Sequence, residues 1–280
     1  MNPAMNQLVT ALFAFTVLAY LTASVVFAAK IAGRESSPKV ERAGYLALAF
    51  GGVAHLIHVV LWSLVLNVCP VEGIYFPLSL GANLMVGAFF LLRRRYRLDA
   101  VGSVVAPLAL ATLLASRFAV QATAPSDSLR SVLLPFHITA NLLGVALFSL
   151  ASASALLYLV QERRLKSKQL GGISRLPPLD ALDRAEHRLL IAGFPLLTVG
   201  VVTGTLFLNR VHDETSADLV RAAFGYVTWL LIALVLLLRQ AVGWRGRRAA
   251  LGTLVGFGFT VAVLAFYAFR GSATLRGGLG

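Results

Sequence analysis

The chain has 280 residues, of which 58% are hydrophobic and only 13% are charged, and its formal net charge is +13. Soluble globular proteins carry about 25% charged residues, so this composition excludes an ordinary soluble domain. In a soluble chain, such a positive charge would suggest nucleic acid. Here the basic residues form short clusters between apolar runs, which suits anchoring to the anionic head groups of a lipid bilayer. We therefore expect a lipid bilayer and no nucleic acid as partners.

Eight apolar runs follow one another along the chain. Most are near the roughly 20 residues that a helix needs to cross a hydrocarbon core ~30 Å thick. Because that core offers the backbone no water to bond with, runs of this length are expected to be helices. The fold class predicted is all-α, a polytopic membrane bundle of about eight transmembrane helices. The runs cover residues 7–29, 44–68, 74–92, 99–118, 131–160, 188–209, 220–240 and 249–269.

The basic residues predict the orientation of the bundle. Of the 25 lysine and arginine residues, nineteen lie in or beside the gaps after the first, third, fifth and seventh runs. Basic residues concentrate on the cytoplasmic side of membrane proteins, so those four gaps are predicted to be cytoplasmic and both termini to lie outside. We expect a multi-pass protein of the cell inner (cytoplasmic) membrane.

Two parts are expected, separated by the outer gap before the fifth run. Residues 1–122 form an N-terminal four-helix membrane half, and residues 123–280 hold the last four spans. Small residues predict close helix approach in two places, Gly200-x-x-x-Gly204 and Gly252-x-x-x-Gly256. Cys69 is the single cysteine, so the chain has no disulfide framework and no dithiol motif of its own.

Histidines are the candidate ligands, since acids are almost absent from the apolar runs. His55 and His58 lie near the middle of the second run, three residues apart and thus on one helical face. Ionisable groups at that depth are costly and usually serve a pathway, a cofactor or an interhelical hydrogen bond. A single-ligand or substrate-contact role and simple interhelical hydrogen bonding both fit this pair. His187, in contrast, is placed at the cytoplasmic interface.

A second candidate site lies at the outer level. His137 opens the fifth run, and His212 falls in the outer gap between the sixth and seventh runs, so the two could approach a haem iron from opposite sides. Asn141 lies one turn from His137 and could orient its ring. Arg210 and Arg221 lie at the same level and could meet haem propionates. The alternative is that His137 and His212 are merely solvated and bind no haem.

An ordered set of motifs over about half the chain resembles the cytochrome c assembly protein family of CcsA-type and HemX-type haem-handling membrane proteins. The set begins at the His137 helix start, and spans 1 to 4 match only loosely. The matching stretches are residues 134–141, 155–163, 176–183, 193–200 with 203–204, 228–229, 243–250 and 256–257.

The chain also departs from this family. Members that attach haem carry a tryptophan-rich outer loop between the spans equivalent to 6 and 7, whereas residues 209–224 contain no tryptophan. Those members also carry an outer histidine after the last span, and no histidine follows Phe269. His137 matches the family's outer histidine before the loop, while His212 matches no family position. The chain is therefore closer to the HemX-type branch, which also lacks the tryptophan loop.

The resemblance implies handling or presentation of haem b at the outer face of the membrane, with His137 as the iron ligand. It implies apocytochrome c and an outer-facing cytochrome c assembly protein as partners. The chain would be at most a subunit that assists haem attachment, because Cys69 alone cannot supply a reduced thiol pair. One alternative is a HemX-type membrane regulator or scaffold of tetrapyrrole metabolism that binds no haem. The other is a small-molecule transporter, which needs paired broken helices with polar groups at the midplane.

The topology can be tested with reporter fusions. A reporter that works only outside the cytoplasm should be active when fused after Gly280. A reporter that works only in the cytoplasm should be active when inserted between Lys166 and Arg175, because gaps rich in basic residues stay on the cytoplasmic side. The opposite result for both fusions would overturn the helix count or the orientation.

Overall fold

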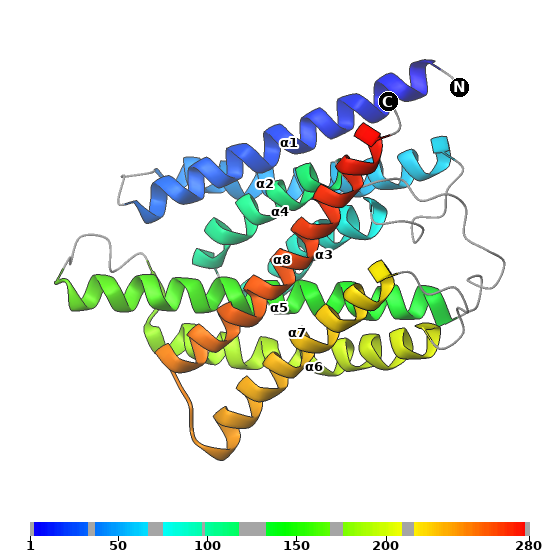
Figure 1. Cartoon of the computed structure of the whole chain (residues 1–280). Coiled ribbons are helices and arrows are strands. Elements are labelled where there is room, and N and C mark those ends of the chain that lie inside the picture. The colour runs from blue at the N-terminus through cyan, green and yellow to red at the C-terminus, as the bar shows by residue number, and fades with distance from the viewer. Residues whose placement is uncertain are drawn as a thin grey trace.

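A computed structural model describes residues 3–32, 37–66, 75–96, 99–117, 133–168, 176–208 and 216–277. Within these ranges the chain forms eight α-helices and one short 3₁₀ helix, with no strand, so the predicted all-α bundle is confirmed (Figure 1). The elements are α1 (Pro3–Ile31), α2 (Pro38–Leu66), α3 (Tyr75–Tyr96), η1 (Asp99–Val101), α4 (Gly102–Ser116), α5 (Leu133–Lys166), α6 (Leu179–Leu208), α7 (Ser216–Ala241) and α8 (Arg247–Gly277).

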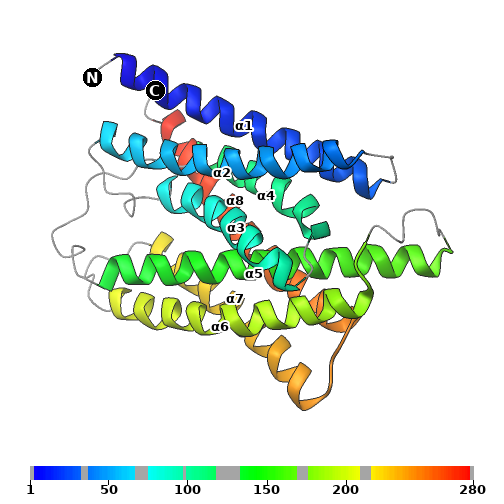
Figure 2. The same ribbon diagram turned by 180° about the vertical axis from the view of Figure 1, so that it is seen from behind.

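Each predicted apolar run falls within one of these elements or at its ends. Among the described residues, seven segments are long and apolar enough to cross a membrane: α1, α2, α3, η1 with α4, α5, α6 and α7. Helix α8 coincides with the eighth run. The start of α1 and the end of α8 lie at the same end of the bundle in both views (Figures 1 and 2). Eight crossings, the number predicted from the sequence, would place the two ends on the same side.

Helix α5 lies at the centre of the packing. It contacts α6, α3 and α8, while α1 packs on α2 and α4, and α7 packs on α8 and α6. Its apolar segment is the most buried of the seven candidate spans. Helix α5 therefore lies between helices of the two predicted parts of the chain.

Glycines allow α5 and α6 to approach closely. A methyl group added at Gly144 of α5 would lie 2.7 Å from Leu197 Cγ and 3.1 Å from the Leu197 backbone nitrogen of α6. One added at Gly193 of α6 would lie 3.3 Å from the Gly144 carbonyl oxygen. Such separations leave room for no side chain larger than hydrogen, as expected for small-residue helix contacts in membranes.

Both small-residue motifs make the predicted close approaches. Gly200 and Gly204 of α6 face side chains of α5. An added methyl group at Gly252 of α8 would lie 2.7 Å from Val235 Cγ2 of α7, and one at Gly256 would lie 3.3 Å from Phe148 Cζ of α5.

Helix α6 begins well before the apolar run that predicted it. Helix α6 begins at Leu179, directly after Pro177 and Pro178, whereas the sixth apolar run begins only at residue 188. Hydropathy missed its first turns because they carry charged residues, among them Glu186, which is fully buried against neighbouring helices instead of facing water. The helix therefore places acidic groups inside the bundle.

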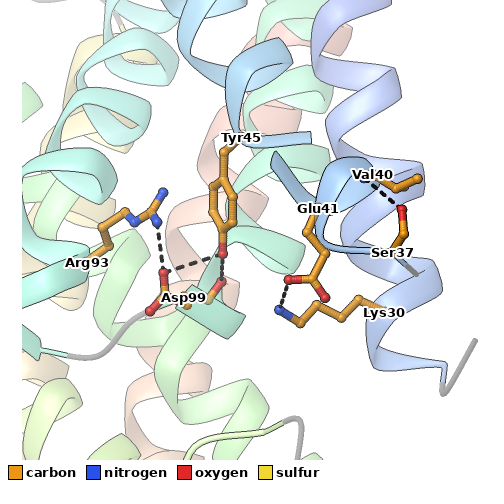
Figure 3. Close-up of polar contacts among 7 residues, drawn as sticks. All are labelled: Lys30, Ser37, Val40, Glu41, Tyr45, Arg93 and Asp99. Atoms are coloured by element: carbon orange, nitrogen blue, oxygen red, sulfur yellow. Dashed lines mark hydrogen bonds and ion pairs between the residues drawn. The ribbon is translucent and has the colours of Figure 1, made fainter. Parts of the chain in front are cut away.

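At one end of the bundle, specific contacts tie neighbouring helices together (Figure 3). Lys30 Nζ at the end of α1 lies 2.7 Å from Glu41 Oε2 in the first turn of α2. Arg93 Nη2 of α3 lies 3.1 Å from Asp99 Oδ1 of η1, and its guanidinium lies 3.9 Å from the centre of the Tyr45 ring of α2. Some of the basic residues expected to face lipid head groups thus also fasten one helix to the next.

Candidate functional site

His55 of α2 is fully buried and bridges three helices. Its Nδ1 lies 3.1 Å from the Tyr20 hydroxyl of α1, and its Nε2 lies 2.8 Å from the Ser79 hydroxyl of α3. Both ring nitrogens are engaged, as a buried polar ring requires. This geometry supports the interhelical hydrogen-bonding alternative for His55.

His58 of α2 is also buried and faces α1. Its Nδ1 lies 3.0 Å from the Val9 carbonyl oxygen, which can only accept, so Nδ1 carries the proton and donates it. The ring is nearly parallel to that of Trp62, with centroids 6.5 Å apart, and Phe13 packs beside it. The prediction that both histidines share one helical face is met, since both point from α2 toward α1.

His137 lies in the second turn of α5, half-buried against α6. Its Nδ1 lies 2.8 Å from Thr203 Oγ1. The Thr203 hydroxyl donates its own hydrogen to a backbone carbonyl, at 2.6 Å from Val199 O or 3.1 Å from Gly200 O. Because that hydrogen is used, Thr203 Oγ1 accepts from His137, so Nδ1 carries the ring proton and Nε2 carries the lone pair. This is the tautomer of a histidine that ligates a metal through Nε2.

Asn141 fixes the same ring from its own helix, as predicted from the one-turn spacing. Its Nδ2 lies 3.2 Å from His137 Nε2 and donates to the His137 carbonyl oxygen at 3.1 Å. Its Nδ2 also lies 3.3 Å from His137 Nδ1, so the amide packs against the ring between its two nitrogens and not along the Nε2 lone pair.

Glycines of α6 make room for this arrangement. A methyl group at Gly200 would overlap the Asn141 side-chain amide, and one at Gly204 would lie 3.0 Å from His137 Cε1. The Gly200-x-x-x-Gly204 motif thus receives the two polar side chains of α5 in addition to allowing helix contact.

The other residues predicted for the His137 site have no described side chains. His212 and Arg210 lie outside the described residues, and Arg221 belongs to α7 in a part where only the backbone is described. Among the described residues, no group of three or more histidine, cysteine, aspartate or glutamate side chains could hold a metal ion. A single histidine that ligates haem iron does not need such a group.

Sequence reasoning missed a buried charged cluster near the start of α6, the end of α7 and the start of α8. Arg239 Nη2 of α7 lies 2.9 Å from Asp183 Oδ1, and Arg239 Nη1 lies 3.6 Å from Glu186 Oε1. Thr253 of α8 donates to Glu186 Oε1 at 2.7 Å. The available signal was that Asp183 and Glu186 are three residues apart and so share a helical face.

The His55 network makes a prediction about stability. We expect His55→Ala to lower the free energy of unfolding by about 2–4 kcal/mol, since it leaves a cavity and removes the partner of two buried hydroxyls. Thermal unfolding of the purified protein in detergent measures this, with the half-buried His187→Ala as control. An unchanged midpoint for His55→Ala would show that the network does not hold α1, α2 and α3 together.

Comparison with known proteins identifies the family. The family described as Cytochrome C assembly protein matches residues 71–274, which is most of the chain and includes α3 and α4 as well as the last four helices.

Individual relatives agree with this match. A "Cytochrome c biogenesis protein CcsA" of Guillardia theta is 26% identical over 226 residues, which is 70% of this chain and 74% of that protein. The protein of the same name from Chlamydomonas reinhardtii is 28% identical over 162 residues, 56% of this chain and 45% of that protein. The one from Synechococcus elongatus is 37% identical over 79 residues, 28% of this chain and 24% of that protein. The chain thus matches less than half the length of two of these relatives. It is a multi-pass membrane protein that belongs to the cytochrome c assembly protein family.

Proposed function

We propose that this protein handles haem b at the outer face of the cell inner membrane during cytochrome c assembly, with His137 as the iron ligand. The observation that carries the proposal is the Thr203 hydrogen bond, which leaves the lone pair of His137 on Nε2. Family membership supports the process, and the topology expected from the basic residues supports the outer face.

The residues around His137 fit a haem ligand. Its Nδ1–H donates a hydrogen bond to Thr203 Oγ1. In histidines that ligate a metal, the ring N–H that faces away from the metal usually donates to such an acceptor. The Asn141 amide lies 3.2 Å from Nε2 and 3.3 Å from Nδ1, so it packs against the ring without lying along the Nε2 lone pair. Haem would supply the vinyl groups to which a cytochrome's thiols are attached, while this chain binds and orients it.

The other outer residues enter the proposal from the sequence. His212 is proposed as the second axial ligand, and Arg210 and Arg221 as partners of the haem propionates. The proposed protein partners are apocytochrome c and an outer-facing assembly protein. Because Cys69 is the single cysteine, reduced thiols would come from the partner and not from this chain.

One observation favours a second candidate. The interval 209–224 contains no tryptophan, which resembles the HemX-type branch. In that case the protein would be a membrane regulator or scaffold of tetrapyrrole metabolism that does not bind haem.

Haem binding separates the two candidates. Purified wild-type protein titrated with haemin should show a saturable Soret band, and His137→Ala should abolish or shift that band because the iron loses an imidazole. Added imidazole should restore part of the wild-type spectrum by filling the vacant position.

His187→Ala is the matched control, because this half-buried histidine lies near the cytoplasmic end of α6. It should leave the spectrum unchanged. Wild-type protein without saturable binding would favour the regulator, and binding that His137→Ala leaves untouched would remove His137 from the site.

A further inference from the structure

Glu186 is an acidic residue in the interior of the bundle that the proposed haem site does not use. It lies two turns into α6, near the cytoplasmic end, and its side chain is fully buried. His137 of α5 contacts Thr203, which lies near the other end of α6. Any role of Glu186 is therefore separate from the outer site.

The two carboxyl oxygens of Glu186 have different surroundings. Oε1 accepts a hydrogen bond from the Thr253 hydroxyl of α8 at 2.7 Å. Oε2 is buried and has no hydrogen-bond partner among the described residues. An ionised carboxylate accepts at both oxygens, whereas a carboxylic acid has one carbonyl oxygen and one hydroxyl. The observed asymmetry fits the acid, with Oε1 as the carbonyl oxygen.

The nearby positive charge is already paired with Asp183. Arg239 Nη2 lies 2.9 Å from Asp183 Oδ1 and donates to the Asp183 carbonyl oxygen at 3.2 Å. The Gly246 backbone N–H donates to the same Asp183 carboxylate at 2.8 Å. Glu186 is left with a 3.6 Å contact to Arg239 Nη1, and that nitrogen makes no hydrogen bond with any described residue.

Other charged groups near the cluster do not supply the missing positive charge. Tyr158 and Glu162 of α5 add no cation, and Arg247 at the start of α8 lies 4.0 Å from Glu162. His187 of α6 and Arg245, which precedes α8, lie beside the cluster and interact electrostatically with each other. Among the described residues, the side chains bonded to Glu186 are those of Arg239 and Thr253, and neither His187 nor Arg245 bonds to it. The buried core thus holds two carboxyl groups and one guanidinium.

We propose that Glu186 is a proton-binding site, occupied in this structure as the neutral carboxylic acid with its hydrogen on Oε2. An unpaired buried charge costs far more free energy than an unpaired buried hydroxyl, so the carboxylate takes up a proton from water on the cytoplasmic side. With that proton, Asp183 and Arg239 form a balanced ion pair.

A pair of isosteric substitutions tests the proposal in the full-length protein. Glu186→Gln replaces a neutral acid by a neutral amide, so its unfolding midpoint should stay within about 2 °C of the wild type. Asp183→Asn removes the charge that pairs with Arg239 and should lower the midpoint by more than about 6 °C. The two residues are one turn apart on α6 and contact the same arginine.

Infrared spectroscopy detects the proton directly. The wild-type minus Glu186→Gln difference spectrum should contain the carbonyl band of a protonated carboxylic acid. Thr253→Val, which removes the hydrogen bond to Oε1, should shift that band even if Glu186→Gln does not fold. Absence of the band, or a fall in the midpoint for Glu186→Gln as large as that for Asp183→Asn, would show an ionised Glu186 paired with Arg239 and would overturn the proposal.

Discussion

The close contact between α5 and α6 is the constraint on which the rest of the structure depends. Gly144 of α5 and Gly193 of α6 let the two backbones approach until side chains of one helix meet the main chain of the other. Near the C-terminal end of α6, Gly200 and Gly204 continue the same contact and receive Asn141 and His137. The spacing between the helices therefore determines how the His137 ring is held. Because lipid offers helices no hydrophobic driving force to associate, such close packing and interhelical hydrogen bonds hold the bundle together.

Much of the fold could be predicted from sequence because the hydrocarbon core restricts the alternatives. Long apolar runs must be helices there, and the segregation of basic residues indicates how the helices alternate. The start of α6 could not be found in this way, since Asp183 and Glu186 face Arg239 and the interior instead of water. Hydropathy reports composition and does not report which neighbour satisfies a charged group.

The candidate site was only partly predictable for a related reason. The one-turn spacing of His137 and Asn141 was visible in the sequence, and the structure places their side chains in contact. The partner Thr203 is 66 residues away along the chain, so only the packing of α6 on α5 could reveal it. Likewise, the depth of His55 was evident from the sequence, but its bonds to Tyr20 and Ser79 depend on how α1 and α3 pack against α2. The haem role of these histidines and of His212, Arg210 and Arg221 stays a prediction.

The reduction potential of bound haem tests the central claim most directly. If Thr203 Oγ1 accepts a hydrogen bond from the Nδ1–H of His137, that bond makes the imidazole a stronger iron ligand and favours the ferric state. Thr203→Val in haem-loaded protein should then raise the potential above the wild-type value, while Thr203→Ser, which keeps the hydroxyl, should leave it unchanged. An identical potential in the wild type, Thr203→Val and Thr203→Ser would contradict the assignment of His137 as the haem ligand oriented by α6.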